Sequence, residues 1–585
     1  MGKTEGRRRR RRKRRWIIGG TIVLLVVVWL AILSAKAVSA YHHDQQGLAA
    51  LQQVRSELGP DDLTSTVSVD RLNGARAQFD AASSDLSSPL FGPITIVPVV
   101  GRQLRSAQSL SSAAGTVSGV GSSFIAQVHG VLHQRHGAGP DRVTSLRGLS
   151  AASLSAERQL AHVDTGPSQA LVAPLSSKHD EFIGQLDEAR SRLSTAAGVS
   201  AAVATILQGP QSYVVLASNN AEMRAGSGAF LDVGSATTSD GSVHLGSFEP
   251  SGEHTLPAGA VDVTGDFERN WGWLNPSLDL RNLGLTPQFD VTAPVAARMW
   301  TALTGQPVNG VIAIDVAGLQ KLLEATGPVV ADGQTVSADN VEQFLLHDQY
   351  AGLTDNAADA NDRQDALGAL ARAVLDQLQG QTIDITSLAK AMSGAVAGRH
   401  LMLWSSNPTD QAAWVASGAS GSLTARSVSV SLINLGGNKL DQFVPVQVAV
   451  TTARSGPDTA VSMTARVVNN TPPGESQFIA GPFPGVPVGY GGYRGLMAVN
   501  LPAAASHITM TGTGPLAIKG AEGPTWLVAA PITVSQGATS TANIHFVMPG
   551  GHGSMTIVPS ARIPPEQWMI HGSAVPDTAA TTVRW

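Results

Sequence analysis

The chain has 585 residues, of which 43% are hydrophobic and 14% charged; this composition excludes a disordered chain, and the length exceeds what one hydrophobic core holds. It contains no cysteine, which excludes a disulfide framework and thiolate metal ligation. The net charge is −4, yet residues 1–15 hold ten Lys and Arg residues beside a single acid. The rest is therefore acidic, which argues against nucleic acid as a partner, because a nucleic-acid-binding domain gathers its basic residues on the folded part.

An uncharged apolar run, Trp16 to Leu33, follows this basic segment. At about 1.5 Å per residue it is just long enough to cross the hydrocarbon core as a helix. The basic residues on its N-terminal side hold that side in the cytoplasm. We therefore predict a cytoplasmic basic tail over 1–15 and a transmembrane helix over 16–34, which makes this a single-pass plasma-membrane protein with an extracytoplasmic body. The alternative is a cleaved signal peptide, because "AVSA" ending at Ala40 resembles a cleavage site.

Residues 35–207 have the pattern of an extracytoplasmic helical bundle. Apolar residues at three- and four-residue spacing form a single stripe, namely Val69, Leu72, Ala75, Phe79, Ala82 and Leu86. The segment "SSPLFGPITIVPVVG", residues 87–101, is rich in Pro and Gly and predicts a connector between helices. Its apolar side chains leave two alternatives open, packing on the bundle or contact with the bilayer surface.

Residues 208–425 predict an α/β domain, because strand patterns alternate with helix patterns. The expected order is strands at 213–217, 229–234 and 241–248, a helix from 289 that stops at Gly305, a strand at 311–314, a helix that ends at Gly327, and helices at 337–348 and 361–378. Asp315 stands between the fourth strand and its helix, where its carboxylate would cap the helix N-terminus.

Beyond residue 425 short alternating strands separated by Gly and Pro predict a C-terminal β-sandwich over 426–585. Gly436, Gly437 and Asn438 lie between two of these strands and predict a hairpin turn. The fold class is therefore multidomain α+β, with a single N-terminal transmembrane helix, a helical bundle, an α/β domain and a β-sandwich.

Polar residues gather directly after the first strand of the α/β domain, in "NNAEMRAGSGAF". Asn219, Asn220, Glu222 and Arg224 would lie at the mouth of the cleft where such sheets usually bind ligands. Two alternatives need no ligand: the amides fix a turn through bonds to the backbone, or Glu222 and Arg224 pair with each other. The common hydrolase, zinc and nucleotide-binding motifs are not found in the sequence.

Several segments in order resemble a bacterial membrane-anchored family of unassigned function that carries an N-N-A-E-[LM]-R strand end. They are "NNAEMRAGSGAF", "LNPSLDL", "VNGVIAIDVAGLQKLLEATGPV" and "DNVEQFLLHDQY", with "GRQLRSAQSLSSAA" upstream. The resemblance covers residues 90–420. It implies a location in the cell envelope and names no activity.

The segment 308–329 and the helix "NDRQDALGALARAVLDQL" distantly resemble the LytR–CpsA–Psr phosphotransferases. Those enzymes move a lipid-pyrophosphate-linked glycopolymer onto peptidoglycan, and the resemblance implies their α/β fold here. It places Arg363 and Gln364 on their Arg-Gln pair and adds Arg224 as a second phosphate ligand. It also implies Mg²⁺, with Asp362 as a candidate metal ligand, although that carboxylate is first a favourable charge at a helix N-terminus. No cofactor is established by the residues alone.

The sequence also departs from that family. Ser251, Gly252 and Glu253 stand where its Arg-Asp would follow the third strand, and Ala360 stands where a second arginine would precede Arg-Gln. We therefore expect a single-pass envelope protein that binds or transfers a polyprenyl-pyrophosphate-linked glycopolymer, with the bilayer and peptidoglycan as further partners. The alternative is a non-enzymatic envelope scaffold or a glycan- or partner-binding protein. Whether the chain is an enzyme stays open; if it is one, it is a LytR–CpsA–Psr-like phosphotransferase.

Overall fold

The computed structural model describes residues 27–53, 66–132, 139–331, 333–351, 357–380 and 385–585, without the side chains of 66, 351, 357–367, 380, 385 and 386. Most of the predicted span Trp16 to Leu33 lies outside these residues. Within the described ranges no helix has both the length and the apolar character needed to cross a membrane. The chain divides into two compact units, residues 1–135 with 145–200, and residues 136–144 with 201–585.

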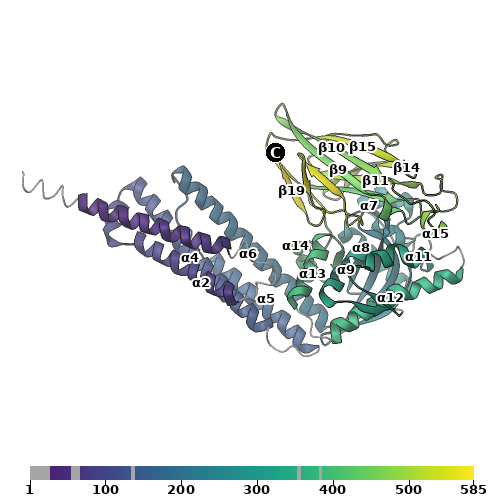
Figure 1. Cartoon of the computed structure of the whole chain (residues 1–585), viewed down its shortest axis with the longest axis horizontal. Helices are drawn as coiled ribbons and strands as arrows, with labels where there is room; N and C mark the ends of the chain where they lie inside the picture. Colours follow the sequence, from purple (N-terminus) through teal and green to yellow (C-terminus); the bar gives the residue numbers. More distant parts are fainter. Residues whose placement is uncertain (1–26, 54–65, 133–138, 332, 352–356, 381–384) are drawn as a thin grey trace, which may run out of the picture. The chain divides into compact units, whose positions relative to one another are not determined.

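The first unit is helical, and its long helices run side by side (Figure 1). Its helices are a segment over residues 27–53, α2 (Thr66–Leu86), α3 (Gly92–Thr95), α4 (Pro98–Leu132), and most of α5 (Pro140–Ala161) and of α6 (Ala173–Gln208). The predicted apolar stripe on α2 is confirmed: Ala75 and Ala82 are fully buried and Phe79 is 2% exposed. Small residues let these helices approach closely, since a Cβ on Gly47 would lie 2.7 Å from the Phe79 ring.

The second unit begins with a mixed sheet in the strand order β3-β2-β1-β4-β7. Its strands are β1 (Gln211–Met223), β2 (Gly228–Ser239), β3 (Ser242–Pro250), β4 (Gly310–Asp315) and β7 (Leu401–Ser405). The surrounding helices are α7 (Gly265–Trp271), α8 (Phe289–Thr304), α9 (Val316–Thr326), α10 (Val341–Gln343), α11 (Gln349–Ala351), α12 (Ala357–Gly380), α13 (Ile385–Ala397) and α14 (Pro408–Ser417). Shorter elements are η3 (Ser251–Glu253), η4 (Gly272–Leu274), η5 (Leu280–Leu285), η6 (Phe344–Asp348), β5 (Val329–Ala331) and β6 (Gln334–Val336).

Alternation along β1 buries both faces of this sheet. Val214 and Leu216 point to the face that α8 covers, where Ala293 and Met299 meet them in one core. Tyr213 and Val215 point to the opposite face. Because β1 pairs with β2 on one side and with β4 on the other, its C-terminal end lies in the middle of the sheet edge, where ligands of α/β sheets bind.

Residues 426–585, all of which the structure describes, form two sheets around one core. One sheet is ordered β12-β15-β10-β9-β17-β18 and the other β13-β14-β11-β8-β16-β19. Their strands are β8 (Ser427–Asn434), β9 (Val446–Ser455), β10 (Asp458–Val468), β11 (Tyr493–Pro502), β12 (Ser506–Thr511), β13 (Ile518–Glu522), β14 (Thr525–Val534), β15 (Thr539–Met548), β16 (Ser554–Ile557), β17 (Gln567–Ile570), β18 (Ser573–Val575) and β19 (Thr581–Arg584); η7 (Asp441–Phe443) and α15 (Gln477–Ala480) lie in connections.

The hairpin predicted at Gly436–Gly437–Asn438 is wrong. β8 belongs to one sheet and β9 to the other, so the segment between them crosses from layer to layer. Asn434 at the end of β8 holds this crossing, because its Oδ1 accepts the Gly436 N–H at 2.8 Å and its Nδ2 donates to Asp441 Oδ2 at 2.9 Å. The glycines permit the tight turn, and the shared core decides which strands pair.

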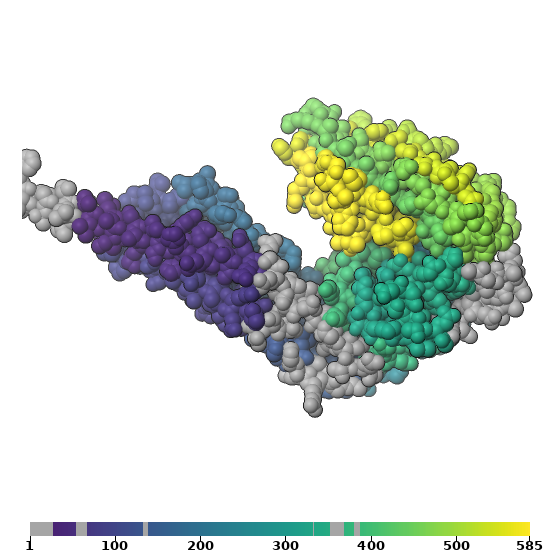
Figure 2. All heavy atoms as spheres, viewed as in Figure 1, coloured from purple at the N-terminus to yellow at the C-terminus, as the bar shows by residue number. Residues whose placement is uncertain are grey.

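The sandwich packs directly against the α/β domain (Figure 2). The fully buried pair Arg562–Asp441, with 3.0 Å between Nη1 and Oδ1, fixes the sandwich side of this junction. Asp441 Oδ2 also accepts the backbone N–H of Met223, at 3.0 Å. The end of β1 is therefore tied to the sandwich, and the polar motif after the first strand lies at this junction.

Candidate functional site

The polar motif forms a bulge at the C-terminal end of β1. The pairing with β2 is regular up to Ala217 opposite Asp232 and shifts register before Ser218 opposite Phe230. After Asn219 opposite Ala229 it resumes only at Met223 opposite Gly228, so residues 220–222 have no partners across β2. Gly228 allows this arrangement, since a Cβ there would lie 2.0 Å from the Asn219 carbonyl oxygen. The bulge turns Asn220 and Glu222 in different directions, as bulges near functional sites often do.

Asn220 is fully buried and bonds to the α/β domain and the sandwich at once. Its Nδ2 donates to Asp315 Oδ2 at 2.9 Å and to the Ala561 carbonyl at 2.8 Å. Asp315 caps α9 as predicted, because its Oδ1 accepts the Gly318 N–H at 2.9 Å. His400 Nδ1 lies 2.8 Å from Asp315 Oδ2. Asn220 is therefore a structural link. The turn-forming amide that the sequence left as an alternative is Asn219, whose Oδ1 accepts the Ala221 N–H at 2.8 Å.

Glu222 forms an ion pair with Lys439 of the β8–β9 crossing segment. The two side chains are 14% and 5% exposed, so this pair is largely desolvated. Burial alone would raise the pKa of Glu222, but the positive charges of Lys439, Arg224 and Arg281 outweigh it and hold that pKa below its ordinary value. Glu222 is thus ionised within a group of three cations, and its direct partner is Lys439 rather than Arg224.

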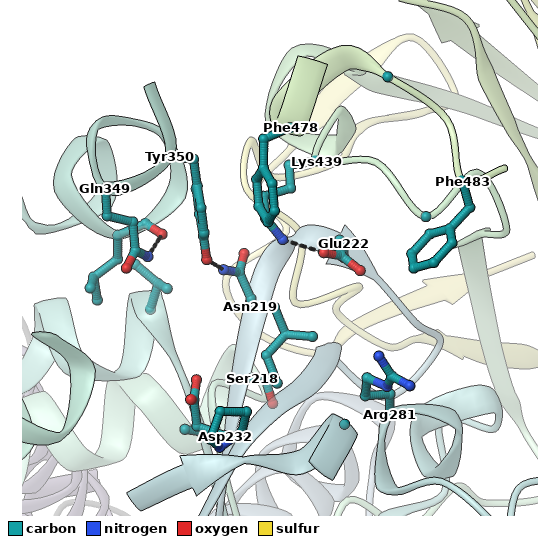
Figure 3. A pocket seen from close by; sticks show the side chains of 18 of the residues that line it. Ser218, Asn219, Glu222, Asp232, Arg281, Gln349, Tyr350, Lys439, Phe478 and Phe483 are labelled. Carbon is teal, nitrogen blue, oxygen red and sulfur yellow. Dashed lines mark hydrogen bonds and ion pairs between the residues drawn. The ribbon is translucent and has the colours of Figure 1, made fainter. Parts of the chain in front are cut away.

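A pair of stacked aromatic rings flanks this ion pair (Figure 3). The rings of Tyr350 and Phe478 lie 5.5 Å apart between centroids with an angle of 16°, and Lys439 Nζ lies 4.5 Å from the Tyr350 centroid. Asn219 Nδ2 lies 2.7 Å from the Tyr350 hydroxyl oxygen. Cation–π contact and stacking together hold the ammonium group and both rings in place.

These groups line a cavity of about 690 Å³ between the end of β1 and the loops of the sandwich. Its polar and charged lining includes Ser218, Asn219, Glu222, Asp232, Glu253, Arg281, Gln349, Lys439 and Gln477; its aromatic lining is Tyr350, Phe478 and Phe483. Phe483 is 59% exposed and lies across from Phe478 in Figure 3. Arg281 is held by Asp279 through both carboxylate oxygens, with 3.0 Å from Nε to Oδ1. The volume is that of an ordinary small-molecule site.

Arg224, the predicted anion ligand, is not one of the residues that line this cavity. Its Nη1 donates to the carbonyl oxygens of Met223 and Asn434, at 3.1 and 3.0 Å. Burial lowers the pKa of Arg224, against the opposing charges of Glu222 and Asp441. The guanidinium group thus joins β1 to β8 at the junction of the two domains.

The other predicted ligands lie on α12 (Ala357–Gly380), which confirms the expected helix. The side chains of Asp362, Arg363 and Gln364 lie outside the described residues. The convergence of Arg363 with Arg224 therefore stays a prediction, as does the role of Asp362 as a metal ligand. In the part of the chain that the structure describes, no group of three or more His, Asp or Glu side chains is arranged to hold a metal ion.

Comparison with known proteins places a family domain on this site. Residues 208–350 match the family model whose description is "Protein of unknown function (DUF4012)". A DUF4012 domain therefore spans these residues. It contains the bulge of β1 and Tyr350 as its last residue, but ends before Lys439 and Phe478. No protein with a curated description and no solved structure matches the chain.

Of the side chains that line this cavity, the sequence pattern singled out only Asn219 and Glu222. Tyr350 stood in the family-like segment "DNVEQFLLHDQY" without a role. Phe483 stood in a Gly- and Pro-rich stretch, and Phe478 belongs to the short helix α15. Lys439 directly follows Gly436, Gly437 and Asn438. The sequence pattern around it therefore indicated a turn and gave no indication of a binding residue. An ion pair whose partners lie 217 residues apart leaves no local pattern.

Proposed function

We propose that the protein is a single-pass, membrane-anchored cell-envelope protein whose extracytoplasmic body binds a glycan in the cavity of the DUF4012 domain and the sandwich. The observation that carries the glycan assignment is the composition of the cavity lining. Exposed and half-buried aromatic faces stand beside amide, carboxylate and guanidinium groups, which offer planar donors and acceptors to sugar hydroxyls. The anchor and its orientation rest on residues 1–15 and on the apolar run Trp16 to Leu33.

The charges in the cavity favour an uncharged glycan over a free pyrophosphate. Lys439 is paired with Glu222 and Arg281 with Asp279, so each cation that lines the cavity already has a carboxylate partner. An anion that took Lys439 from Glu222 would leave a largely buried carboxylate without its partner, at a cost of about 3–5 kcal/mol. Hydroxyl groups can bond to the outer edges of both pairs without breaking either.

The second candidate is transfer of a polyprenyl-pyrophosphate-linked glycopolymer onto peptidoglycan. One observation favours it: Arg281 and Lys439 line the same cavity, so the site does offer cationic groups even though Arg224 is bonded elsewhere. The reaction would use Mg²⁺ and the guanidinium groups to neutralise phosphate charge. It rests further on Arg363 and Gln364, whose placement in the sequence resembles the phosphotransferases.

Calorimetric titration of the full chain with uncharged oligosaccharides tests the first proposal. The probes are oligomers of glucose, galactose, mannose and N-acetylglucosamine, and the variant is Phe483→Ala. Removing one stacking face is expected to weaken binding about five- to tenfold. Trp273→Ala is the matched control, because Trp273 is 55% exposed and does not line the cavity. Unchanged affinity in the Phe483 variant, or no binding of any oligomer, would reject the glycan site.

The second candidate is tested by purifying the full chain from membranes and analysing it for bound polyprenyl lipid. Transfer predicts that this lipid is present and that Arg281→Ala and Arg363→Ala reduce it. Breaking the pyrophosphate bridge sends one phosphate with the glycan to the acceptor, so polyprenyl monophosphate should be released only when Mg²⁺ and peptidoglycan are added. Lipid that is absent from the natural chain rejects transfer and leaves the glycan proposal unaffected.

A further inference from the structure

Residues 87–101, which run from the end of α2 into the first turn of α4 and are called the connector below, expose several large apolar side chains. Phe91 is buried at 6% exposure, so one end of the connector packs on the bundle. Ile94 is half-buried. Five other apolar side chains are exposed, with fractions of 38% for Leu90, 80% for Ile96, 47% for Val97, 64% for Val99 and 50% for Val100. A contiguous run of this kind marks an interaction surface rather than ordinary solvent contact.

Contacts with the helix over residues 27–53 fix the position of this connector along the axis of that helix. Trp29 Nε1 donates to the Leu90 carbonyl at 3.0 Å, and about two turns further on Lys36 pairs with Asp85 at 2.9 Å. Ala40 then packs in one cluster with Leu86. The helix over residues 27–53 therefore runs antiparallel to α2, and the connector lies beside the first described turn of this helix, which starts at one end of the helical unit (Figure 1).

That first turn belongs to the run Trp16 to Leu33, which we expect to cross the membrane. Leu33 is the last residue of the run, and Trp29 precedes it by about 6 Å of helix rise. The connector therefore lies level with the last turn of the predicted transmembrane run, on the membrane side of its end at Leu33. Apolar segments of interfacial proteins typically reach about 5–10 Å into the boundary between headgroups and acyl chains.

The apolar surface of the connector continues onto the helix beside it. Val27, Val28, Leu30 and Ile32 are 43–55% exposed. The charges agree with an anionic lipid surface, since residues 86–105 contain Arg102 and Arg105 and no acid. Arg105 Nη1 donates to the Thr95 carbonyl at 3.1 Å, which places this cation next to the connector. Basic side chains beside an apolar insertion are the usual arrangement at a headgroup layer.

We propose that the 87–101 connector inserts into the outer leaflet of the membrane beside the anchor, with Ile96 and Val99 as the side chains that enter the lipid. This inference rests on the proposed membrane anchoring. A second attachment point next to the anchor holds the helical unit at a fixed angle to the bilayer, because rotation about a single helix would pull the connector out of the lipid. The occupant of this surface is thus the lipid bilayer itself.

The absence of cysteine allows a direct test by site-specific labelling of the full chain. Ile96→Cys, Val27→Cys and Leu48→Cys are each labelled with a polarity-sensitive fluorophore and reconstituted into vesicles of phosphatidylcholine and phosphatidylglycerol. Spin-labelled lipids then quench any fluorophore that lies within the leaflet. Leu48 is 41% exposed on the same helix, about 28 Å of helix rise beyond Trp29, and serves as the matched control in water.

Loss of fluorescence at positions 96 and 27, with position 48 unaffected, is the expected result. A label at 96 that behaves like the one at 48, while position 27 is quenched, overturns the insertion but keeps the anchor. If position 27 is not quenched either, the proposed anchoring fails together with the insertion. A label at 96 that is shielded from water but not quenched by lipid assigns the surface to a second copy of the chain and overturns the proposal.

The double variant Ile96→Ser with Val99→Ser provides a second readout in the same vesicles. Both side chains are largely exposed, so the helical unit is expected to keep its circular dichroism and its unfolding temperature. With the connector polar, a label at Val100→Cys is expected to lose its quenching by lipid. Quenching that persists at position 100 in the double variant contradicts the role of these two side chains.

Discussion

Asn220 on β1 and Asp315 at the start of α9 are joined side chain to side chain, with 2.9 Å between Nδ2 and Oδ2. Asn220 Oδ1 in turn accepts the backbone N–H of Val316 at 3.2 Å. The amide thus satisfies one donor of the helix N-terminus while the carboxylate satisfies another. Because Asn220 also donates to the Ala561 carbonyl, this one side chain joins the sheet, the helix and the sandwich.

The first prediction concerns Asn220→Ala. The substitution leaves the Val316 N–H and the Ala561 carbonyl buried without partners, and each such group costs about 1–3 kcal/mol. We expect the free energy of unfolding, measured in urea, to fall by about 2–4 kcal/mol. The matched control is Asn543→Ala on strand β15, whose side chain makes one exposed bond to Thr464; a change within about 0.5 kcal/mol is expected there. An equal loss in both variants would show that the link adds no stability.

The second prediction concerns the Lys439–Glu222 pair. Lys439→Met removes the main charge that holds the pKa of Glu222 low, so that pKa should rise and stability should fall by about 3–5 kcal/mol. In the double variant Lys439→Met with Glu222→Leu no charge is left unpaired, and most of the loss should be recovered. A double-mutant cycle in urea measures this coupling. Additive losses in the two single variants would mean that the ion pair is not coupled.

The same pair predicts how stability depends on acid. Because the folded-state pKa of Glu222 lies below its ordinary value, its contribution is fully present above about pH 4.5 and is lost as the pH falls through the folded pKa. The Glu222→Leu with Lys439→Met variant should lack this part of the acid dependence. Thermal unfolding of both proteins at a series of acidic pH values checks the difference, and parallel curves would exclude Glu222 as the titrating group.

The third prediction concerns His400. Burial would lower the pKa of His400, but the charge of Asp315 and the hydrogen bond to it raise that pKa above its ordinary value. The charge of Asp577 raises the pKa further, and the charge of Lys321 lowers it. Glu342 is a further acidic group that interacts with His400. A raised folded pKa means that the stabilisation is fully present below about pH 6.5 and is lost as the pH rises through the folded value. The unfolding temperature should fall over that range in the natural chain and stay flatter in His400→Gln. His545→Gln, at an exposed site on β15, should keep the natural slope.

The fourth prediction compares two glycines. Gly228→Ala places a Cβ 2.0 Å from the Asn219 carbonyl oxygen, so β1 and β2 must separate at the bulge. A loss of about 3 kcal/mol, at the upper end for overpacking, is expected in the unfolding free energy. Gly74→Ala on α2 meets nothing within 4 Å and should instead stabilise the helical unit by about 0.5–1 kcal/mol. Similar effects of the two substitutions would contradict the close approach seen at Gly228.

The helices and strands of this protein could largely be predicted because their determinants are local. The stripe on α2, the Asp315 cap and the stop at Gly305 each depend on residues within a few positions of one another. The same reasoning failed at Gly436–Gly437–Asn438, where a good turn sequence connects two sheets. A turn permits a reversal of the chain, but packing of the sandwich core decides which strand the chain meets next.

The sequence by itself determined the polar cluster after the first strand, the basic tail before an apolar run, and the order of helical, mixed and all-β regions. Only the tertiary structure decided that Asn220 is a link, that Arg224 bonds to the backbone at the junction, and that Lys439, Tyr350 and Phe478 complete the cavity with Asn219 and Glu222. The physical reason is the range of the interactions. Periodicity, caps and charge runs act between neighbours, whereas a buried ion pair and a stacked ring pair form between residues that only the packed domains bring together.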